Sequence, residues 1–358
     1  MGETDDAEEG LKRRLGELVR RDLGARAAAV EPLAGGLGTR RFFRVHTDGA
    51  PSSLVARVER PEDPAGRPEG VAPEPPLEPL RAFLEAAGLP VPRRLGGDPE
   101  RGIDLLEDLG EESLADAARA EPARRPELYA QVCAWIPRLQ SLTDPGDLPA
   151  FRRRLDAALL DYKAELFTRW SLPVALGRAP RLSEGRAVRD AFAAVAEACA
   201  EAPARLAHRD LQSHNVLVRR EVGRPPRLGL IDLQGAFLAP PEYDLVCLLR
   251  DSYVQLPDAE LEAQLAAVRP ALPDAPDPPS FGRRFDLLTL TRKGKDHARF
   301  LFAAVTRGDH RYLRFVPATV RSLQRAATRV AGSDPRLARL AELVAALPAT
   351  EEPPPCAP

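Results

Sequence analysis

The chain has 358 residues, of which 44% are hydrophobic and 29% charged, and its formal net charge is −2 at pH 7. This length is too great for one ordinary core and suits two domains or a bilobal enzyme. The near-neutral charge gives no electrostatic reason to expect nucleic acid or an anionic membrane as a partner. The acidic first ten residues lack an apolar run, and no later stretch approaches the roughly 18 apolar residues of a membrane span. Because the four cysteines are scattered without metal-ligand spacing, we expect reduced thiols in a cytoplasmic protein. We also expect a monomer.

The first part of the chain carries most of the strand signals. Amphipathic spacing predicts a helix over 8–23 and another over 77–87, the latter ending at Gly88. Short apolar runs between turn residues predict five strands, near 28–33, 41–47, 53–59, 92–96 and 102–106.

Helical periodicity dominates after LLEDLG (105–110), with one exception. We expect helices over 111–119, 126–142, 151–170, 185–201, 242–255, 258–269, 283–306 and 317–330. The exception is a β-hairpin made of NVLVRR (215–220) and RLGLIDL (227–233). The sequence therefore predicts an α+β fold with a small strand-rich part (1–106), a larger and mainly helical part that contains the hairpin (107–350), and a frayed tail (351–358).

The polar residues of HRDLQSHNVLV (208–218) and LIDLQG (230–235) gather at this hairpin. Asp210 and Asn215 lie five residues apart in the loop before its first strand, and Asp232 ends its second strand, so three oxygen-bearing side chains can converge. Carboxylate and amide oxygens suit Mg²⁺, which binds through few protein groups plus phosphates. Phosphoryl transfer needs this division of labour, with Asn215 and Asp232 holding the ion and Asp210 accepting a proton from a hydroxyl. The alternative is a solvated polar turn.

The spacing H-R-D-x-x-x-x-N is the catalytic-loop signature of protein kinases. At this point the chain resembles the aminoglycoside phosphotransferase group of the kinase-like superfamily, and within it the bacterial anomeric kinases of N-acetylmuramate and N-acetylglucosamine. The matching stretches follow the family's order over nearly the whole chain: GTRRFFRV (38–45), ERGIDLLEDLG (100–110), HRDLQSHNVLV (208–218), IDLQGAFLAPPEYDLVCLLRDSY (231–253) and TRKGKDHARFLF (291–302). The resemblance implies a bilobal protein-kinase-like fold with ATP and Mg²⁺ bound between a five-stranded N-lobe and a helical C-lobe.

The same resemblance assigns the nucleotide site to the N-lobe and the hinge. LLEDLG would be the hinge, with the backbone around Glu107 and Leu109 bonding adenine. Gly36 and Gly38 of AGGLGT would form the glycine loop, although a full G-x-G-x-x-G is lacking and a plain hairpin turn is the alternative.

Two departures from the family pattern stand out. The third strand of kinase-like enzymes usually offers a Lys to the phosphates, paired with a helix Glu. Here LVARVER offers Arg57, with Glu78 as the helix candidate, and an edge-strand surface charge is the alternative for Arg57. Gly235 stands where the sugar kinases carry an Asp.

The composition of the C-terminal helices bears on the acceptor. Residues 281–330 hold twelve Lys or Arg against three Asp. Such a surface repels polycations and accepts an anionic or neutral sugar. Arg292 and Lys295 are our candidates for the lactyl carboxylate of N-acetylmuramate, with Gln212 as a further substrate-binding candidate; a solvated helix face is the alternative.

Two further residues are expected to support the loop. His208 would hold it through hydrogen bonds, and Asp244 of EYDLV would brace it.

We therefore expect an ATP- and Mg²⁺-dependent sugar kinase of peptidoglycan recycling that acts on a small-molecule acceptor. Three other interpretations stay open. One is a kinase of another hydroxyl, on an amino alcohol, a hexose or an aminoglycoside. A second is a nucleotide-binding pseudokinase with a regulatory role, motivated by Arg57, Gly235 and the incomplete glycine loop. A metal-dependent hydrolase is weaker, because no closed ligand cluster is present.

Overall fold

The computed structural model describes residues 2–33, 40–59, 75–220 and 223–352. The chain divides into two compact units and passes between them several times. The first unit consists of Met1–Glu74, Pro90–Glu111 and Leu217–Ile231, and the second of Pro75–Leu89, Glu112–Val216 and Asp232–Pro358. Among the helices of the described chain, none combines the length and the apolar character that crossing a bilayer requires.

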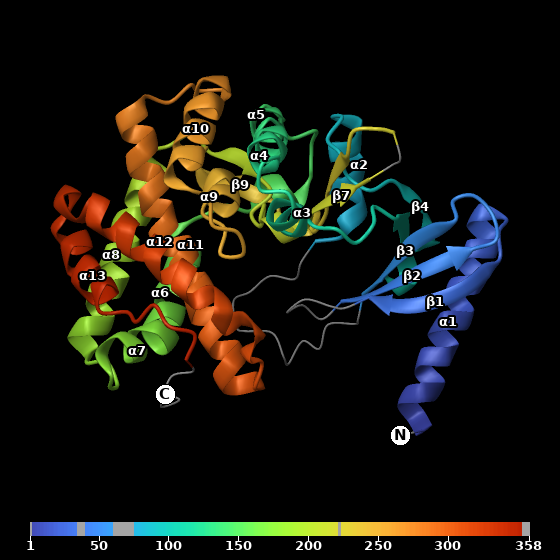
Figure 1. Cartoon of the computed structure of the whole chain (residues 1–358), viewed down its shortest axis with the longest axis horizontal. Coiled ribbons are helices and arrows are strands. Elements are labelled where there is room, and N and C mark those ends of the chain that lie inside the picture. The colour runs from blue at the N-terminus through green and yellow to red at the C-terminus, as the bar shows by residue number, and fades with distance from the viewer. Residues whose placement is uncertain (1, 34–39, 60–74, 221–222, 353–358) are drawn as a thin grey trace. The chain divides into compact units, whose positions relative to one another are not determined.

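The first unit is built on a five-stranded antiparallel sheet in the order β1-β2-β3-β5-β4, with α1 packed beside it (Figure 1). Its elements are α1 (Gly2–Leu23), β1 (Ala27–Leu33), β2 (Arg41–Thr47), β3 (Ser53–Val58), β4 (Arg94–Asp98), β5 (Ile103–Glu107), β7 (Val216–Arg219) and β8 (Arg227–Leu230). Leu15 and Val19 of α1 are fully buried in one apolar cluster with Phe43, Leu54 and Leu105 of the sheet. Burial of this helix face and the alternate side chains of the central strands stabilises the unit.

The hairpin of β7 and β8 belongs to this first unit. The amide of Leu230 donates to the carbonyl of Pro90 (2.7 Å), which joins β8 to the segment before β4. A Cβ on Gly229 would lie 2.5 Å from Cδ1 of Leu109, so the bare glycine lets Leu109 pack closely on β8.

The second unit is mainly helical and carries a short pair of strands. Its elements are α2 (Leu77–Ala86), α3 (Leu114–Ala120), α4 (Arg125–Cys133), α5 (Trp135–Gln140), α6 (Ala157–Leu166), α7 (Leu172–Leu176), α8 (Leu182–Ala200), β6 (Arg205–Ala207), β9 (Phe237–Ala239), α9 (Tyr243–Leu249), α10 (Asp258–Val268), α11 (Pro278–Arg307), α12 (Val316–Val330) and α13 (Pro335–Ala345).

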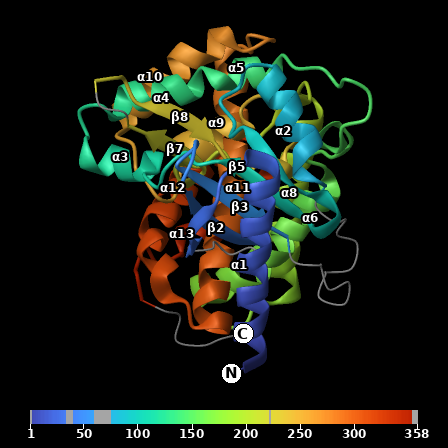
Figure 2. The same cartoon turned by 90° about the vertical axis from the view of Figure 1, so that its right-hand side faces the viewer.

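Helix α11 is the longest helix of this unit and packs against α6, α8, α9 and α12 (Figure 2). The carboxylate of Asp277 caps its start by accepting the amide of Ser280 (3.0 Å), and two prolines follow the cap. It ends at Gly308, whose φ of 64° is the left-handed conformation that favours glycine at a helix C-terminus. Helix α11 therefore presents long polar side chains along a rigid element inside the unit.

The α+β class predicted from the sequence is confirmed, as is the strand-rich beginning of the chain. The helix predicted over 126–142 is interrupted at Ala134, because Pro137 has no N–H to donate to Cys133. The helix predicted over 151–170 starts only after Asp156. Residues 153–155 instead run extended beside Leu238, exchanging backbone hydrogen bonds of 2.8 Å with it. Helix α13 and the pair β6–β9 were not predicted.

Candidate active site

The loop from His208 to Asn215 connects β6 to β7 and carries the candidate catalytic residues. Arg209 has a φ of 79°, and Asp232, which follows β8, has a φ of 63°. Non-glycine residues adopt this conformation at an energetic cost, and such strain clusters at functional sites. The backbone on both sides of the site is therefore held by the surrounding structure in a conformation that it would not adopt alone.

Two carboxylates hold the backbone of this loop. Asp244, at the start of α9 and 1% exposed, accepts the amide N–H groups of His208 (2.7 Å) and Arg209 (3.0 Å). Asp251, 4% exposed, accepts the amide of Ser213 (2.9 Å) and also contacts its hydroxyl. Asp244 thus makes the contacts expected of a brace. Asp251 was missed, although DSY (251–253) ends the stretch that resembles the sugar kinases.

Asn215 and Asp232 lie side by side at the hairpin. Nδ2 of Asn215 donates to the carbonyl of Asp210 (2.8 Å) and lies 3.5 Å from Oδ2 of Asp232. Nε2 of Gln234 donates to the other oxygen of Asp232 (2.6 Å). The two candidate metal ligands are therefore oriented by neighbouring groups, and Asp232 is exposed at the surface of its unit.

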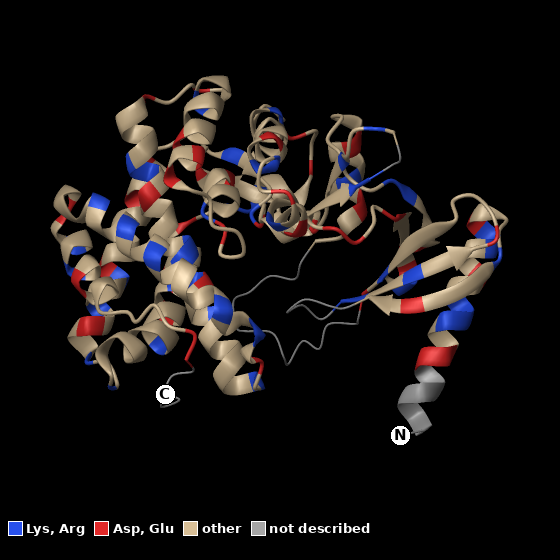
Figure 3. Cartoon of the chain, viewed as in Figure 1, with Lys and Arg blue, Asp and Glu red and all other residues tan. Residues whose placement is uncertain are grey.

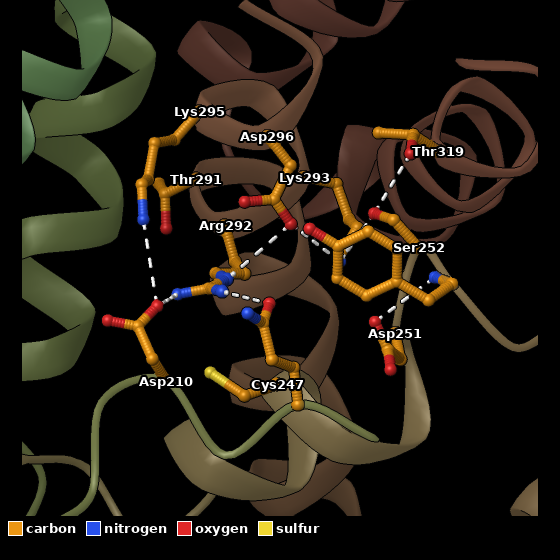
Figure 4. Close-up of polar contacts among 12 residues, drawn as sticks. Asp210, Cys247, Asp251, Ser252, Thr291, Arg292, Lys293, Lys295, Asp296 and Thr319 are labelled. Atoms are coloured by element: carbon orange, nitrogen blue, oxygen red, sulfur yellow. Dashed lines mark hydrogen bonds and ion pairs between the residues drawn. The ribbon is translucent and has the colours of Figure 1, made fainter. Parts of the chain in front are cut away.

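Asp210 lies against positive side chains from α11 (Figure 4). Nη1 of Arg292 donates to its Oδ1 (2.7 Å), and Nζ of Lys295 lies 3.8 Å from the same oxygen. Burial alone raises the pKa of Asp210. The positive charges of Lys295, Arg292 and Arg209 outweigh that effect, so the pKa lies well below its usual range. Asp210 is therefore an ionised carboxylate at neutral pH.

The three candidates for acceptor binding differ in what they contact. The side chain of Arg292 is 3% exposed, and its Nη1 and Nη2 atoms donate to the loop. One of these acceptors is Oε1 of Gln212 (3.4 Å). Lys295 is 16% exposed, and burial together with the charge of Arg292 lowers its pKa to about 8. The acceptor-binding roles of all three stay predictions. Of the two cations, Lys295 is more exposed to solvent than Arg292.

Gly235 lies next to the second oxygen of Asp210. A Cβ built on Gly235 would be 3.9 Å from Oδ2 of Asp210 and 3.6 Å from Cδ of Arg209, which are ordinary contacts. Steric crowding therefore does not require glycine at this position, and a longer side chain would reach the catalytic loop.

Arg57 lies on β3 and is 3% exposed. Its Nη1 donates to Oδ2 of Asp104 (3.0 Å), the residue opposite it on β5, and its Nη2 contacts Glu59. In the second unit, Glu78 accepts from Arg81 on the same helix (2.8 and 3.0 Å). Arg57 is thus paired within its own sheet, and sequence reasoning missed Asp104. The nucleotide-binding roles of Arg57 and Glu78 stay predictions.

The segment predicted to be the hinge (105–110) is tied to its own unit through side chains. Asp108 forms a fork with Arg44 of β2 (2.7 and 3.2 Å), and Glu107 pairs with Arg93 (3.1 Å). These contacts keep the backbone around Leu109 in place, as an adenine-binding segment requires, but the contact with adenine remains a prediction. Gly36 and Gly38 lie outside the described residues.

Comparisons with known proteins identify the family of the chain. Residues 29–280 match the model of the phosphotransferase enzyme family. The chain is 30% identical over 329 residues to the N-acetylmuramate/N-acetylglucosamine kinase of Pseudomonas aeruginosa, covering 90% of this chain and 89% of that protein. It is 27% identical to the protein of the same name from Neisseria meningitidis serogroup B, covering 85% and 87%.

Solved structures show the same fold at low sequence identity. The choline kinase LicA from Streptococcus pneumoniae superposes with a TM-score of 0.59 at 16% identity and covers 90% of this chain and 99% of its own. The GDP complex of wild-type aminoglycoside 2'-phosphotransferase-IIIa gives 0.55 at 16% identity, covering 88% and 98%. The family model spans more than half of the chain, and the two relatives cover 90% and 85% of it, so the chain belongs to the phosphotransferase enzyme family.

Proposed function

We propose that this chain is an ATP- and Mg²⁺-dependent kinase of a cell-wall amino sugar, and that it phosphorylates the anomeric hydroxyl of N-acetylmuramate, N-acetylglucosamine or both during peptidoglycan recycling in the cytoplasm. The observation that carries the proposal is the ionised Asp210 beside the pair Asn215–Asp232, in a chain whose relatives are named as kinases of these two sugars.

Asp210 suits the role of a weak general base and orienting group. Its low pKa makes it a poor base for an ordinary alcohol, but an anomeric hydroxyl is a hemiacetal and more acidic than one. In phosphoryl transfer most of the catalysis comes from positioning and charge stabilisation, so a carboxylate that orients the hydroxyl needs little basic strength.

Asn215 and Asp232 fit a magnesium ion. Their amide and carboxylate oxygens are hard ligands, the two side chains lie 3.5 Å apart, and Asp232 is exposed, which leaves room for water and phosphate oxygens. The ion, when bound, would neutralise charge on the transferring phosphate. Asn215 and Asp232 would hold it from the loop and the end of β8.

The surroundings of Asp210 favour an anionic or neutral acceptor. Lys295 lies beside it, and the charges of Lys295 and Arg292 add to burial in lowering the pKa of the buried Lys163 to about 7. Figure 3 shows further basic residues along α11. N-acetylmuramate differs from N-acetylglucosamine by a lactyl ether with a carboxylate. We propose that Lys295 binds that carboxylate, while cationic acceptors such as choline or kanamycin are disfavoured by like charge.

The test is phosphate transfer from ATP to N-acetylmuramate, N-acetylglucosamine, kanamycin and choline in parallel, with and without Mg²⁺. We expect Mg²⁺-dependent turnover of one or both sugars with loss of the reducing end, because phosphorylation blocks the anomeric hydroxyl. Turnover of kanamycin or choline alone would favour a kinase of another hydroxyl. Nucleotide binding without turnover of any acceptor would favour the pseudokinase.

A further inference from the structure

The guanidinium of Arg292 contacts three positions of the catalytic loop at once. Nη1 donates to Oδ1 of Asp210 (2.7 Å) and to the carbonyl of Arg209 (3.1 Å), and Nη2 donates to Oε1 of Gln212 (3.4 Å). A planar guanidinium presents its donors in a fixed fork, so it can set the orientation of several acceptors together. An arginine that is 3% exposed and engaged in this way has few donors left for a substrate.

On the side of Arg292 away from the loop lies a chain of polar contacts (Figure 4), which begins with an ion pair to Asp296, since Nε of Arg292 has no hydrogen-bond partner in the described structure. Its Nε lies 3.5 Å from Oδ2 of Asp296, one turn further along α11, and Nζ of Lys293 donates to the same oxygen (2.7 Å). Nζ of Lys293 also donates to the hydroxyl of Ser252 (3.0 Å), which lies 2.9 Å from the hydroxyl of Thr319 on α12. The contacts thus run from the catalytic loop through α11 to α12.

The same chain of contacts reaches the catalytic loop at a second place, through the residue that precedes Ser252. Ser252 follows Asp251, whose carboxylate accepts the amide of Ser213. The loop is therefore fixed at 209–212 by Arg292 and at 213 by Asp251, and both supports meet at Lys293 and Ser252. Movement of Arg292 would have to break its hydrogen bonds to the loop and its ion pair with Asp296, which Lys293 holds in turn.

The two carboxylate oxygens of Asp210 differ in their contacts. Arg292 and Lys295 both lie on Oδ1, whereas within the described ranges Oδ2 takes part in no hydrogen bond or ion pair. Oδ2 lies on the side of Gly235, where a Cβ would be 3.9 Å away and the glycine leaves space. One oxygen is thus anchored and the other is available.

We infer that Arg292 is a positioning residue: it anchors Oδ1 of Asp210 so that Oδ2 faces the acceptor hydroxyl, and Asp296, Lys293 and Ser252 hold it in that place. The inference rests on the proposed function, because it takes Asp210 as the group that orients the acceptor. Stability alone does not account for the network, since buried ion pairs are often replaced by apolar side chains at no cost in stability.

The kinetic test compares wild type, Arg292→Met and Arg292→Lys with both sugars, and Arg283→Met serves as control because Arg283 is an exposed arginine of the same helix. We expect Arg292→Met to lower kcat about 100-fold, as misplacing a reacting group does, while KM for either sugar changes less than about threefold. We expect Arg292→Lys to recover about tenfold of this loss, because an ammonium can reach one acceptor at a time.

Two kinetic outcomes would overturn the inference. A raised KM for N-acetylmuramate with N-acetylglucosamine unaffected would make Arg292 a substrate anchor. A lower melting temperature and a smaller nucleotide-binding fraction, with kcat per folded molecule unchanged, would make it a structural residue only. If Arg292→Met does not fold, Asp296→Asn keeps the guanidinium while weakening its support, and kcat should then fall about three- to tenfold with KM unchanged; an unchanged kcat contradicts the inference.

A readout independent of turnover separates this inference from the proposed function. Crystal structures of wild type and Arg292→Met should show the Asp210 carboxylate rotated or spread over several positions in the variant. An unmoved carboxylate would overturn the inference whether or not a sugar is turned over. A displaced carboxylate in a protein that phosphorylates no sugar would refute the proposed function and leave the positioning role of Arg292 standing.

Discussion

Nη1 of Arg292 lies 2.7 Å from Oδ1 of Asp210, so a residue on a long C-terminal helix contacts the carboxylate of a loop 82 positions earlier in the chain. Asp210 also has Lys295 nearby, and it owes its low pKa to these cations against the effect of burial. The site is thus arranged to keep this carboxylate charged and oriented.

Asp210→Asn should keep the fold and nucleotide binding but lower sugar phosphorylation by about 10²–10⁴-fold, the usual contribution of a general base. The carboxamide keeps one oxygen acceptor but cannot take the proton. The measurement is kcat with the preferred sugar, beside nucleotide affinity and melting temperature. Asp161→Asn, on the exposed face of α6, is the control. Near-normal turnover of Asp210→Asn would remove Asp210 from its role.

Asn215→Ala and Asp232→Asn should each raise the Mg²⁺ concentration required for half-maximal turnover by about tenfold or more, because each removes or weakens one hard oxygen ligand. Turnover at saturating Mg²⁺ should recover in part. A titration of Mg²⁺ at fixed ATP measures the effect. An unchanged Mg²⁺ requirement in both variants would show that the ion is held elsewhere.

Lys295→Met should discriminate between the two sugars. Loss of a charge-assisted contact of about 1.5–3 kcal/mol would lower kcat/KM for N-acetylmuramate roughly 10- to 100-fold. N-acetylglucosamine lacks the carboxylate and should be affected far less. Arg299→Met, an exposed residue of the same helix, is the control. Equal losses for both sugars would mean that Lys295 acts on Asp210 and not on the lactyl group.

The same lysine predicts a pH dependence. Burial and the charge of Arg292 lower the pKa of Lys295 to about 8, against the opposing effects of Asp210 and Asp296. The ammonium is therefore present below about pH 8 and is lost above it. KM for N-acetylmuramate should rise as pH passes from 7 to 9, while KM for N-acetylglucosamine stays level. A parallel rise for both sugars would contradict the assignment.

Asp286→Asn should stabilise the protein at pH 7.5 and about half as much at pH 5. Burial raises the pKa of Asp286 to about 6, although Arg329 and Arg250 oppose it, and its Oδ1 has no hydrogen-bond partner in the described structure. The folded state binds more protons than the unfolded state between about pH 4 and 6, so stability falls as pH rises through this window. A carboxamide mimics the protonated acid and avoids that loss, which is about 3 kcal/mol at most.

The measurement for Asp286 is the free energy of unfolding in urea at both pH values. A destabilised variant at pH 7.5 would show that the ion pair with Arg329, at 3.7 Å, contributes more than the burial of the charge costs.

Local patterns were enough to predict the fold class and the five strands of the antiparallel sheet. Alternation and turn residues place strands, and apolar spacing places helices, because both depend on the side chains of neighbouring positions. One prediction was wrong because distant residues intervened: residues 153–155 pair with Leu238 and so do not join a helix. The helix predicted over 126–142 was wrong for a local reason, since Pro137 interrupts it at Ala134.

The candidate residues Asp210, Asn215 and Asp232 could be named from the sequence because the catalytic loop is short and its spacing is characteristic. Their proximity is a consequence of one loop and one adjoining strand end, which is local geometry. Asp104 and Asp251 could not be found in this way, since each meets its partner only through strand pairing or helix packing.

By itself, then, the sequence determined the fold class, the candidate catalytic loop and the likeness to sugar kinases, all of which depend on residues close together in the chain. Tertiary structure alone decided that Arg292 contacts Asp210, that Arg57 pairs with Asp104, and that within the described part of the chain Oδ1 of Asp210 has partners and Oδ2 has none. The physical reason is that the partner of a buried charge is set by the packing of distant elements, and a long arginine side chain can reach several acceptors that no local pattern distinguishes.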